Sequence, residues 1–392
     1  MDLINMTRIP LNGTFELTAR CNLQCKMCLI RLDNDAKSRM NEKSAKEWID
    51  MARQVKQAGT LGLLLTGGEP LLRPDFPEIY SEIASMGFVL TIYTNATLIT
   101  DEIYELFRKL PPHNIGVTVY GASGRTYGLV TGSSNAYERM LEGVDRLRRL
   151  PSRLTVRTTI IKDNLEDLDK ISSWAKGLGP EVEFNVSRIV IMPVRGGIAD
   201  VKAHRLSPTE NVAMLKKLYT ERIIEPLAEF FKANPDIGIG EELAEIIKGR
   251  EEEHNSREHN FECTIYGCEA GINSYTITWD GKLIGCQMLN DCCSYPFEEG
   301  FAKAWEEFPA KVKLLPLPEK CKGCSTPCTS CYATRLAETG SMGGWPEYIC
   351  REAKLKEEME KDLIKELHAN IVRTLYKNKR MPDSMSDRHK NK

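Results

Sequence analysis

The sequence lacks any run of about eighteen apolar residues, so no segment predicts a transmembrane helix. Its first five residues do not have the pattern of a signal peptide. An excess of one charge is also missing, because 53 lysines and arginines are balanced by 55 aspartates and glutamates. Without a basic field, binding to nucleic acid is not expected. We therefore expect a soluble cytoplasmic protein with no membrane partner and no nucleic-acid partner.

Cysteine, in contrast, is abundant, with 13 residues in a chain of 392. Three cysteines lie between residues 21 and 28, and the other ten lie between 263 and 350. Disulfides are rare in the cytoplasm, where thiols are kept reduced. Grouped thiols in that compartment are more often metal ligands or redox-active groups. The two groups are therefore the first candidates for functional sites.

The first group, Cys21, Cys25 and Cys28, has the spacing C-x3-C-x2-C and follows a short apolar stretch. Three soft thiolates in one loop can bind three irons of a [4Fe–4S] cluster and leave the fourth iron without a protein ligand. The alternatives are a zinc site or a set of structural thiols. Zinc normally takes four protein ligands, often from C-x2-C pairs, whereas the next cysteine here is Cys263. The spacing therefore favours a cluster with one open coordination position.

In the first half of the chain, short apolar runs alternate with amphipathic segments, which is typical of parallel βαβ units. The predicted strands are 14–18, 61–65, 88–93, 114–119, 154–160 and 182–186. The predicted helices are 43–58, 76–86, 101–109, 137–149 and 166–177. Ser44 and Glu47 form the signature of a capping box at the start of the first helix. Functional groups of parallel barrels gather at the carboxyl ends of the strands, and Cys21, Gly67 and Asn95 each follow such an end.

The sequence Thr66-Gly67-Gly68-Glu69-Pro70 follows the second predicted strand. Two glycines let the backbone approach a ligand closely, and proline fixes the exit of the turn. Together with the C-x3-C-x2-C loop, this motif resembles the radical S-adenosylmethionine (SAM) family. The resemblance implies an α/β fold, a partial (β/α)6 barrel, whose open iron binds the amino and carboxylate groups of SAM. It also implies reductive cleavage of SAM to methionine and a 5′-deoxyadenosyl radical, which removes hydrogen from an unactivated C–H bond.

The same resemblance implies several contacts with SAM. The segment 94–97 is similar to the Thr-Asn-Gly-Thr of the family, although Ala96 replaces the glycine. Met27 occupies a position that is commonly aromatic in the family. The implied SAM-binding residues are Gly67, Gly68, Glu69, Asn95, Thr118 and Ser123, with Tyr120, Arg125 and Asn164 nearby. For those that follow the third strand, a turn or helix cap is an equal interpretation when each is taken alone.

The second cysteine group begins around a predicted hairpin with its turn at Asp280-Gly281. Cys268, Gly281 and Cys286 fit the C-x(9–15)-G-x4-C pattern of the SPASM extension of radical SAM enzymes. The following C-x2-C-x3-C-x2-C departs from the family's C-x2-C-x5-C-x3-C. The resemblance implies two auxiliary [4Fe–4S] clusters, with Cys263, Cys268, Cys286 and Cys331 as ligands of the first and Cys321, Cys324, Cys328 and Cys350 as ligands of the second. Two zinc sites are the alternative, and Cys292 and Cys293 are left over.

We expect four parts along the chain. These are a radical SAM barrel core at 1–200, a helical connection at 201–260, a SPASM auxiliary-cluster domain at 261–350, and a C-terminal helix with a disordered tail at 351–392. Helices are predicted at 208–229, at 241–248 and from 351 to about 378, the last by its apolar periodicity.

The SPASM pattern favours oxidation of a ribosomal peptide or protein, as a cross-link, a thioether or a similar maturation. Gln287 stands where sulfatase-maturing relatives have an aspartate base, so formylglycine formation is not favoured. No other acid or base is singled out. The barrel begins almost at once, so a leader peptide would bind a separate protein or the SPASM surface. The resemblance further implies an electron donor such as flavodoxin or ferredoxin.

Two other functions stay open. A radical SAM enzyme could act on a small metabolite instead of a peptide. A non-catalytic iron–sulfur electron-transfer protein would also use many cysteines, but a three-cysteine site followed by Gly-Gly-Glu-Pro argues against it. Formation of 5′-deoxyadenosine from SAM separates this last class from the first two.

Overall fold

The computed structural model describes residues 8–30, 32, 42–188, 190, 199–234, 265, 266, 268–326, 328 and 330–378. The chain divides into two compact units. The first contains Met1–Leu206, Phe261–Pro318 and Cys331–Trp345, and the second contains Ser207–Asn260, Glu319–Ser330 and Pro346–Lys392. Within the described ranges, no helix is both long and apolar enough to cross a membrane. The predicted helix 241–248 and Cys263 lie outside the described residues.

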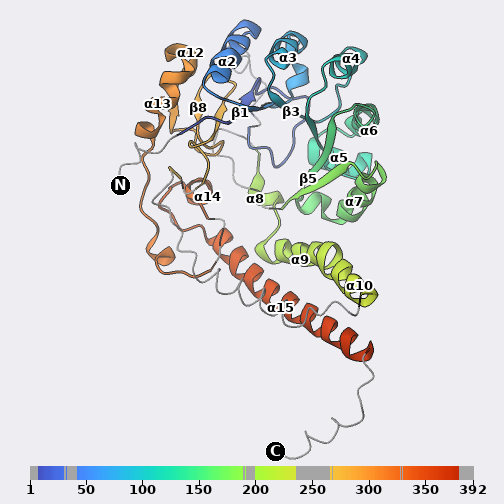
Figure 1. Cartoon of the computed structure of the whole chain (residues 1–392). Helices are drawn as coiled ribbons and strands as arrows, with labels where there is room; N and C mark the ends of the chain where they lie inside the picture. The colour runs from blue at the N-terminus through green and yellow to red at the C-terminus, as the bar shows by residue number, and fades with distance from the viewer. Residues whose placement is uncertain are drawn as a thin grey trace, which may run out of the picture. The chain divides into compact units, whose positions relative to one another are not determined.

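The first unit is built on one nine-stranded sheet in the order β6-β5-β4-β3-β2-β1-β7-β8-β9 (Figure 1). The first six strands are parallel: β1 (Asn12–Glu16), β2 (Gly62–Thr66), β3 (Val89–Thr94), β4 (Asn114–Thr118), β5 (Arg153–Thr159) and β6 (Val182–Ser187). Each lies within two residues of its predicted position. The α/β class and the parallel sheet expected from the sequence are therefore confirmed.

Helices cover the outer side of this sheet (Figure 1). They are α2 (Ala45–Gln57), α3 (Phe76–Ser85), α4 (Asp101–Lys109), α6 (Ala136–Leu147) and α7 (Leu168–Gly177). The capping box is present, because Glu47 N donates to Ser44 Oγ at 3.3 Å and Ser44 N donates to Glu47 Oε2 at 2.8 Å. One further helix, α5 (Gly124–Thr131), was not predicted. Its two glycines, Gly124 and Gly128, lower its helix propensity and interrupt its apolar pattern, so the sequence did not predict it.

The hydrophobic core lies between the sheet and these helices. Leu63 and Leu65 of β2 are buried there, while Leu64 and Thr66 are only half-buried. Since successive residues of a strand face opposite sides, Leu64 and Thr66 point to the inner side of the sheet. Apolar residues thus face the helices, and the inner side keeps space for a ligand.

The predicted hairpin joins the same sheet. Strand β7 (Ser274–Ile277) pairs in parallel with β1, and β8 (Leu283–Ile284) pairs antiparallel with β7. Gly281 in the intervening turn has φ +89°, a conformation that favours glycine. Strand β9 (Cys293–Ser294) completes the edge, and α13 (Phe301–Lys311) packs against it. The segment that contains Cys286 is therefore continuous with the barrel strands.

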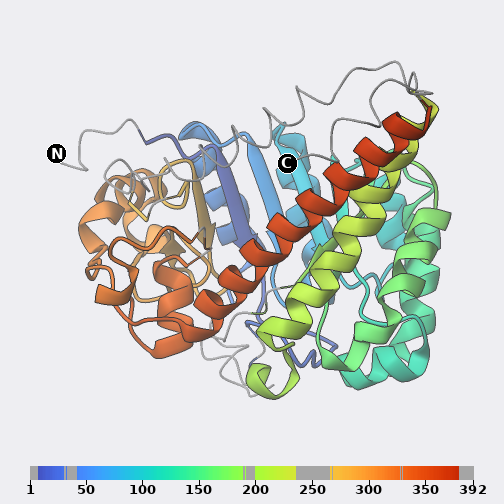
Figure 2. The ribbon, with the colours of Figure 1, turned by 90° about the horizontal axis from the view of Figure 1, so that it is seen from below.

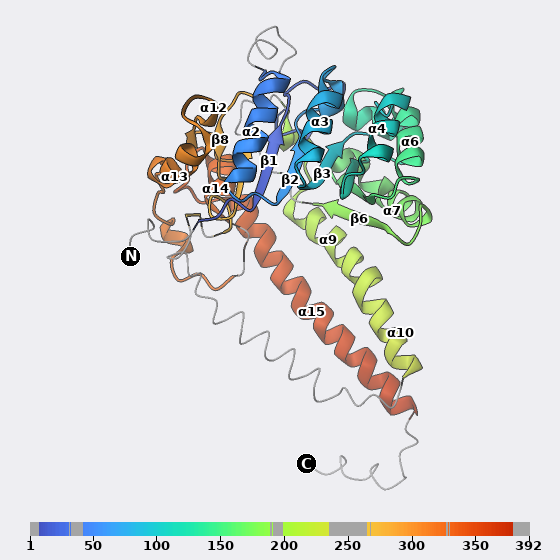
Figure 3. The same ribbon diagram turned by 45° about the horizontal axis from the view of Figure 1, so that its top comes forward.

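The second unit pairs α9 (Pro208–Tyr219) and α10 (Glu225–Ala233) with α15 (Glu347–Asn378). Figures 2 and 3 show these helices side by side. Their buried contact consists of Val212, Leu215, Met359 and Leu363. A π turn, Thr220–Ile224, separates α9 from α10 just before Pro226, which has no N–H to continue the regular ladder. The helices predicted at 208–229 and after 351 are confirmed.

Candidate active site

A cavity of about 720 Å³ lies at the carboxyl ends of the six parallel strands. The last residue of every one of these strands lines it: Glu16, Thr66, Thr94, Thr118, Thr159 and Ser187. Parallel barrels place their functional groups at this end of the sheet. The cavity is therefore the first candidate for an active site.

The thiols of the N-terminal motif, Cys21, Cys25 and Cys28, line the same cavity and are half-buried. Two backbone hydrogen bonds hold their loop against the end of α5. Gln24 N donates to Thr131 O at 2.7 Å, and Lys26 N donates to Val130 O at 3.0 Å. The helix that the sequence did not reveal thus supports the cysteine loop.

The two glycines of the second motif pack directly on the backbone that leads into Cys21. Gly67 has φ +143°, and a Cβ on it would lie 2.3 Å from Thr18 O. A Cβ on Gly68 would lie 2.2 Å from Arg20 O. Gly68 N donates to Thr18 O at 2.7 Å. Only residues without a side chain allow this contact, which brings both motifs to one cavity wall.

Glu69 does not line the cavity but is fully buried beside it. Its Oε1 accepts from Thr94 Oγ1 at 2.8 Å and from Leu71 N at 3.1 Å, and its Oε2 accepts from Asn95 N at 2.7 Å. Burial raises the pKa of its carboxyl to about 7, although these hydrogen bonds oppose the shift. In this structure the carboxyl group fixes the loop after β3 to the loop after β2.

Replacing Glu69 by glutamine is expected to lower the free energy of unfolding by about 1–3 kcal/mol, because the new amide would face a buried N–H donor and leave it unsatisfied. Urea denaturation measures this change. The matched control is Glu82→Gln on the exposed face of α3, which should change stability by less than about 0.5 kcal/mol. Equal stability of Glu69→Gln and the control would contradict the bridging role.

Asn95 does line the cavity, and Glu69 fixes its backbone. Its Nδ2 donates to Asn22 Oδ1 at 2.8 Å and lies 3.9 Å from Cys21 Sγ. The next residue, Ala96, has φ +59°, in the left-handed region that favours glycine. This conformation explains why the motif that the segment resembles has glycine there. Asn95 therefore links the third strand end to the cysteine loop.

Of the remaining predicted contacts, Thr118 and Tyr120 line the cavity, whereas Ser123 does not. Ser123 caps α5 by accepting from Thr126 N at 3.2 Å. Asn164 Nδ2 donates to the carbonyl oxygen of Tyr120 at 3.1 Å, so it connects the ends of two strands. Ser123 and Asn164 thus have structural partners in the described part of the chain. Met27 lies on the cavity wall, as its position suggested.

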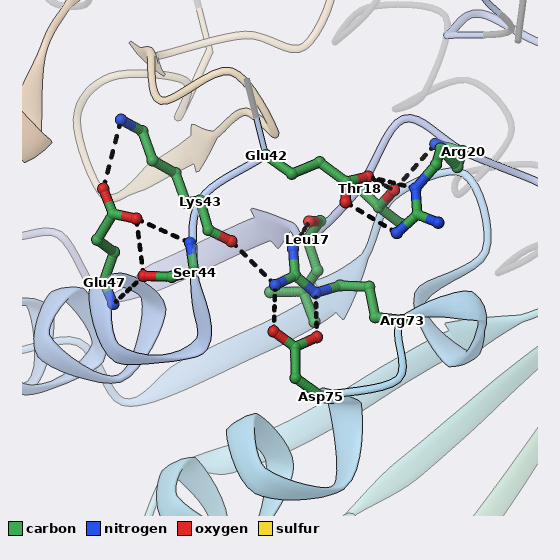
Figure 4. A network of polar contacts seen from close by, with 9 residues as sticks. All are labelled: Leu17, Thr18, Arg20, Glu42, Lys43, Ser44, Glu47, Arg73 and Asp75. Atoms are coloured by element: carbon green, nitrogen blue, oxygen red, sulfur yellow. Dashed lines mark hydrogen bonds and ion pairs between the residues drawn. The ribbon is translucent and has the colours of Figure 1, made fainter. Parts of the chain in front are cut away.

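A polar network that the sequence did not suggest holds the segment before Cys21 (Figure 4). Arg73 donates to Leu17 O at 2.7 Å and pairs with Asp75 at 2.7 Å. Arg20 pairs with Glu42 at 2.8 Å, and Thr18 Oγ1 donates to the same carboxylate. Arg73 and Asp75 share one short loop, but Leu17 and Glu42 come from other segments, so spacing along the chain does not reveal the network.

The donor set, three thiols of one loop on the cavity wall, has the soft ligands that a [4Fe–4S] cluster takes. Within the described ranges, no three His, Cys, Asp or Glu side chains converge as the ligands of one metal ion would. A four-iron cluster places each thiolate on a different iron, so its ligands spread more widely. Burial, with a smaller contribution from Glu69, raises the pKa of the Cys21 thiol to about 12. Coordination to iron would keep that thiol deprotonated.

The predicted ligands of the auxiliary clusters separate between the two units. Cys268, Cys286 and Cys331 belong to the first unit, and Cys321, Cys324, Cys328 and Cys350 belong to the second. In the first unit, the pKa of the buried Tyr266 is raised by burial and then by its neighbours Cys292, Cys286 and Cys268. Cys292 thus lies in the same neighbourhood as two predicted ligands. Gln287, directly after Cys286, lines the cavity of the first motif.

Comparisons with known proteins agree with this geometry. The profile of the Radical SAM superfamily matches residues 15–175. The AdoMet-dependent heme synthase of Methanosarcina barkeri (strain Fusaro) is 30% identical over 346 residues, which cover 86% of this chain and 95% of that protein. The AdoMet-dependent heme synthase of Oleidesulfovibrio alaskensis is 23% identical over a match that covers 83% of this chain and 84% of that protein.

Solved structures share the fold at lower identity. Streptococcus suis SuiB bound to its precursor peptide SuiA gives a TM-score of 0.64 at 18% identity, over 88% of this chain and 77% of that one. Native anSMEcpe with bound AdoMet gives a TM-score of 0.61 at 15% identity, over 92% of this chain and 100% of that one. The motif geometry, the family profile and the full-length relatives lead to one conclusion: the chain belongs to the radical SAM superfamily.

Proposed function

We propose that this radical SAM enzyme oxidises a C–H bond of a small molecule, and that a porphyrin of heme synthesis is its first candidate substrate. The observation that carries the radical SAM activity is that three thiols, the Gly67-Gly68 backbone and all six strand ends line one cavity. The substrate class is supported by the heme synthase of M. barkeri, whose likeness extends over 86% of this chain. This replaces the peptide as the first candidate.

The residues of the cavity would divide the work as follows. Cys21, Cys25 and Cys28 would hold the cluster, and the Gly67-Gly68 backbone would receive the amino group of SAM. Asn95, fixed by Glu69, would orient the cysteine loop through its contacts with Asn22 and Cys21. The cluster and SAM, when bound, supply a 5′-deoxyadenosyl radical that removes a hydrogen atom.

The inner face of the sheet offers space beyond the cysteine loop. A second cavity of about 520 Å³ shares Leu64 and Gln287 with the first cavity. Gln287 lies where the two cavities meet, and its amide can donate and accept hydrogen bonds but cannot remove a proton. We propose that this face receives the substrate and that Gln287 orients it.

The eight predicted auxiliary ligands, without Cys292 and Cys293, would hold two [4Fe–4S] clusters of the SPASM type, which would accept the electron that the substrate radical must lose. A flavodoxin or a ferredoxin would reduce the SAM-binding cluster. A peptide is the second candidate substrate, and its support is the fold shared with SuiB, which was solved with its precursor peptide SuiA. A leader-binding protein would then be an additional partner.

The test is an anaerobic incubation of the iron-loaded protein with SAM and dithionite, followed by chromatography for 5′-deoxyadenosine. A set of iron porphyrins with different side chains is then added, and mass spectrometry follows oxidation of the porphyrin. We expect 5′-deoxyadenosine in every case. For one porphyrin, we also expect an oxidised product that accumulates together with 5′-deoxyadenosine. Absence of 5′-deoxyadenosine would overturn the radical SAM activity. Its formation with product only from a peptide would replace the porphyrin by the second candidate.

A further inference from the structure

Helix α14 (Tyr332–Thr339) begins directly after Cys331, and its Arg335 is fully buried. The Arg335 Nε donates to Cys331 O at 3.3 Å. Its two terminal nitrogens, Nη1 and Nη2, are buried and have no hydrogen-bond partner in the part of the chain that the structure describes. The guanidinium group lies over the ring of Tyr332 at 4.4 Å, a contact that leaves the N–H groups at its edge free to donate to an acceptor.

This arrangement destabilises the folded state unless an anion lies beside the guanidinium group. A guanidinium group stays protonated in proteins, so burial cannot neutralise it as it neutralises a lysine. A buried charge without a partner is strongly destabilising. The nearby acid of the same helix is already used, because Glu338 pairs with Arg205 at 2.6 Å and both side chains are buried. Arg335 therefore requires an anionic group that is not part of this ion pair.

The position of Arg335 indicates what kind of anion this is. Since the side chain is 0% exposed, a substrate that diffuses in from solvent cannot reach it. The partner must be a group that resides in the fold. Cys331, one helical turn away, is the N-cap of α14, at the positive end of the helix dipole. Thr334 Oγ1 also donates toward its sulfur at 3.7 Å. Arg335, the N-terminus of α14 and Thr334 thus all lie around one residue, Cys331.

We propose, on the basis of the auxiliary clusters proposed above, that Arg335 donates hydrogen bonds to the iron–sulfur cluster held by Cys331 and raises its reduction potential. The potential of such a cluster depends on its net charge and on hydrogen bonds to its sulfurs. Reduction adds one negative charge, and a buried cation stabilises the reduced form more than the oxidised form. Arg335 is thus a tuning residue that makes this cluster a better electron acceptor. It does not touch the substrate.

The test compares Arg335→Gln and Arg335→Lys with the wild type by iron content and by a redox titration followed by electron paramagnetic resonance. In Arg335→Gln, the reduction potential of one auxiliary cluster should fall by at least about 59 mV. For one electron, this shift is a tenfold change in the ratio of reduced to oxidised cluster. Arg335→Lys, which keeps the charge, should retain most of the potential. The control Lys303→Gln removes an exposed charge of the same unit and should leave all potentials unchanged.

An unchanged potential in Arg335→Gln with all iron bound would overturn the proposal. If Arg335→Gln instead loses about four irons while Arg335→Lys keeps them, the charge is needed to hold the cluster and the proposal stands. Equal loss in both variants would assign Arg335 a packing role and overturn it. If the wild-type protein binds only about four irons, it has no auxiliary clusters, and this proposal is overturned with them. If the potential shifts in Arg335→Gln but the wild-type protein does not cleave SAM, the proposed function is overturned and the tuning role of Arg335 is retained.

Discussion

Replacement of Cys25 by alanine is expected to abolish SAM cleavage. Among the described residues, Cys25 lines the cavity at the strand ends with only two other thiols, so the cluster has no spare ligand among them. The loaded wild type should contain about twelve irons and Cys25→Ala about eight, because only the SAM-binding cluster is lost. Chromatography for 5′-deoxyadenosine and an iron assay measure both results.

The matched control for this variant is Cys293→Ala. Cys293 is a half-buried thiol in β9 and does not line the cavity. This control should keep both the iron content and the rate of SAM cleavage. Cleavage retained by Cys25→Ala at the rate of the control would contradict the three-thiol site.

Replacement of Gly68 by alanine is expected to lower the rate of SAM cleavage by about 10²-fold, the size of effect that a 1 Å misplacement at a reacting centre produces. The new methyl group would lie 2.2 Å from Arg20 O and 2.7 Å from Ala19 O. Both are backbone atoms and cannot rotate away. The segment that enters Cys21 must therefore move, and overpacking should also cost about 1–3 kcal/mol of stability. Turnover with saturating SAM and urea denaturation measure the two effects.

Gly177→Ala is the control for this second variant. A Cβ on Gly177, in α7, would meet nothing within 4 Å. This change should leave turnover unchanged and stabilise the protein by about 0.4–1 kcal/mol through the unfolded chain. If Gly68→Ala behaves like Gly177→Ala, the close packing of the two motifs is not required for activity.

Much of the fold could be predicted because the first half of the chain alternates cleanly. In β2, Leu63 and Leu65 alternate with half-buried residues, and glycine or a cap marks the ends of the elements. The exception is α5, whose glycines weaken the helical signal. The hairpin at Gly281 was predictable from its turn, but its pairing with β1 depends on a contact across more than 250 residues.

In the site, too, the local motifs were predictable from the sequence, whereas the contacts between distant segments were not. The three thiols form one local motif and Gly67-Gly68 another, and the resemblance to the radical SAM family placed both at one site. Glu69 was expected among the SAM contacts, yet the structure places it behind the wall, with three donors from the segments that follow β2 and end β3. Arg335 gave no sequence signal, because a buried arginine looks like any other until its neighbours are known. Contacts between distant segments decide such roles.

The pairing of β1 with β7 has a consequence for biosynthesis. Of the described strands, β1 leaves the ribosome before the others, but its second neighbour begins only at Ser274. Throughout most of translation the N-terminal strand has one open edge, and open edges invite pairing with other nascent chains. Assembly of the complete sheet therefore waits for the cysteine-rich segment, and a truncated product that stops before β7 should aggregate.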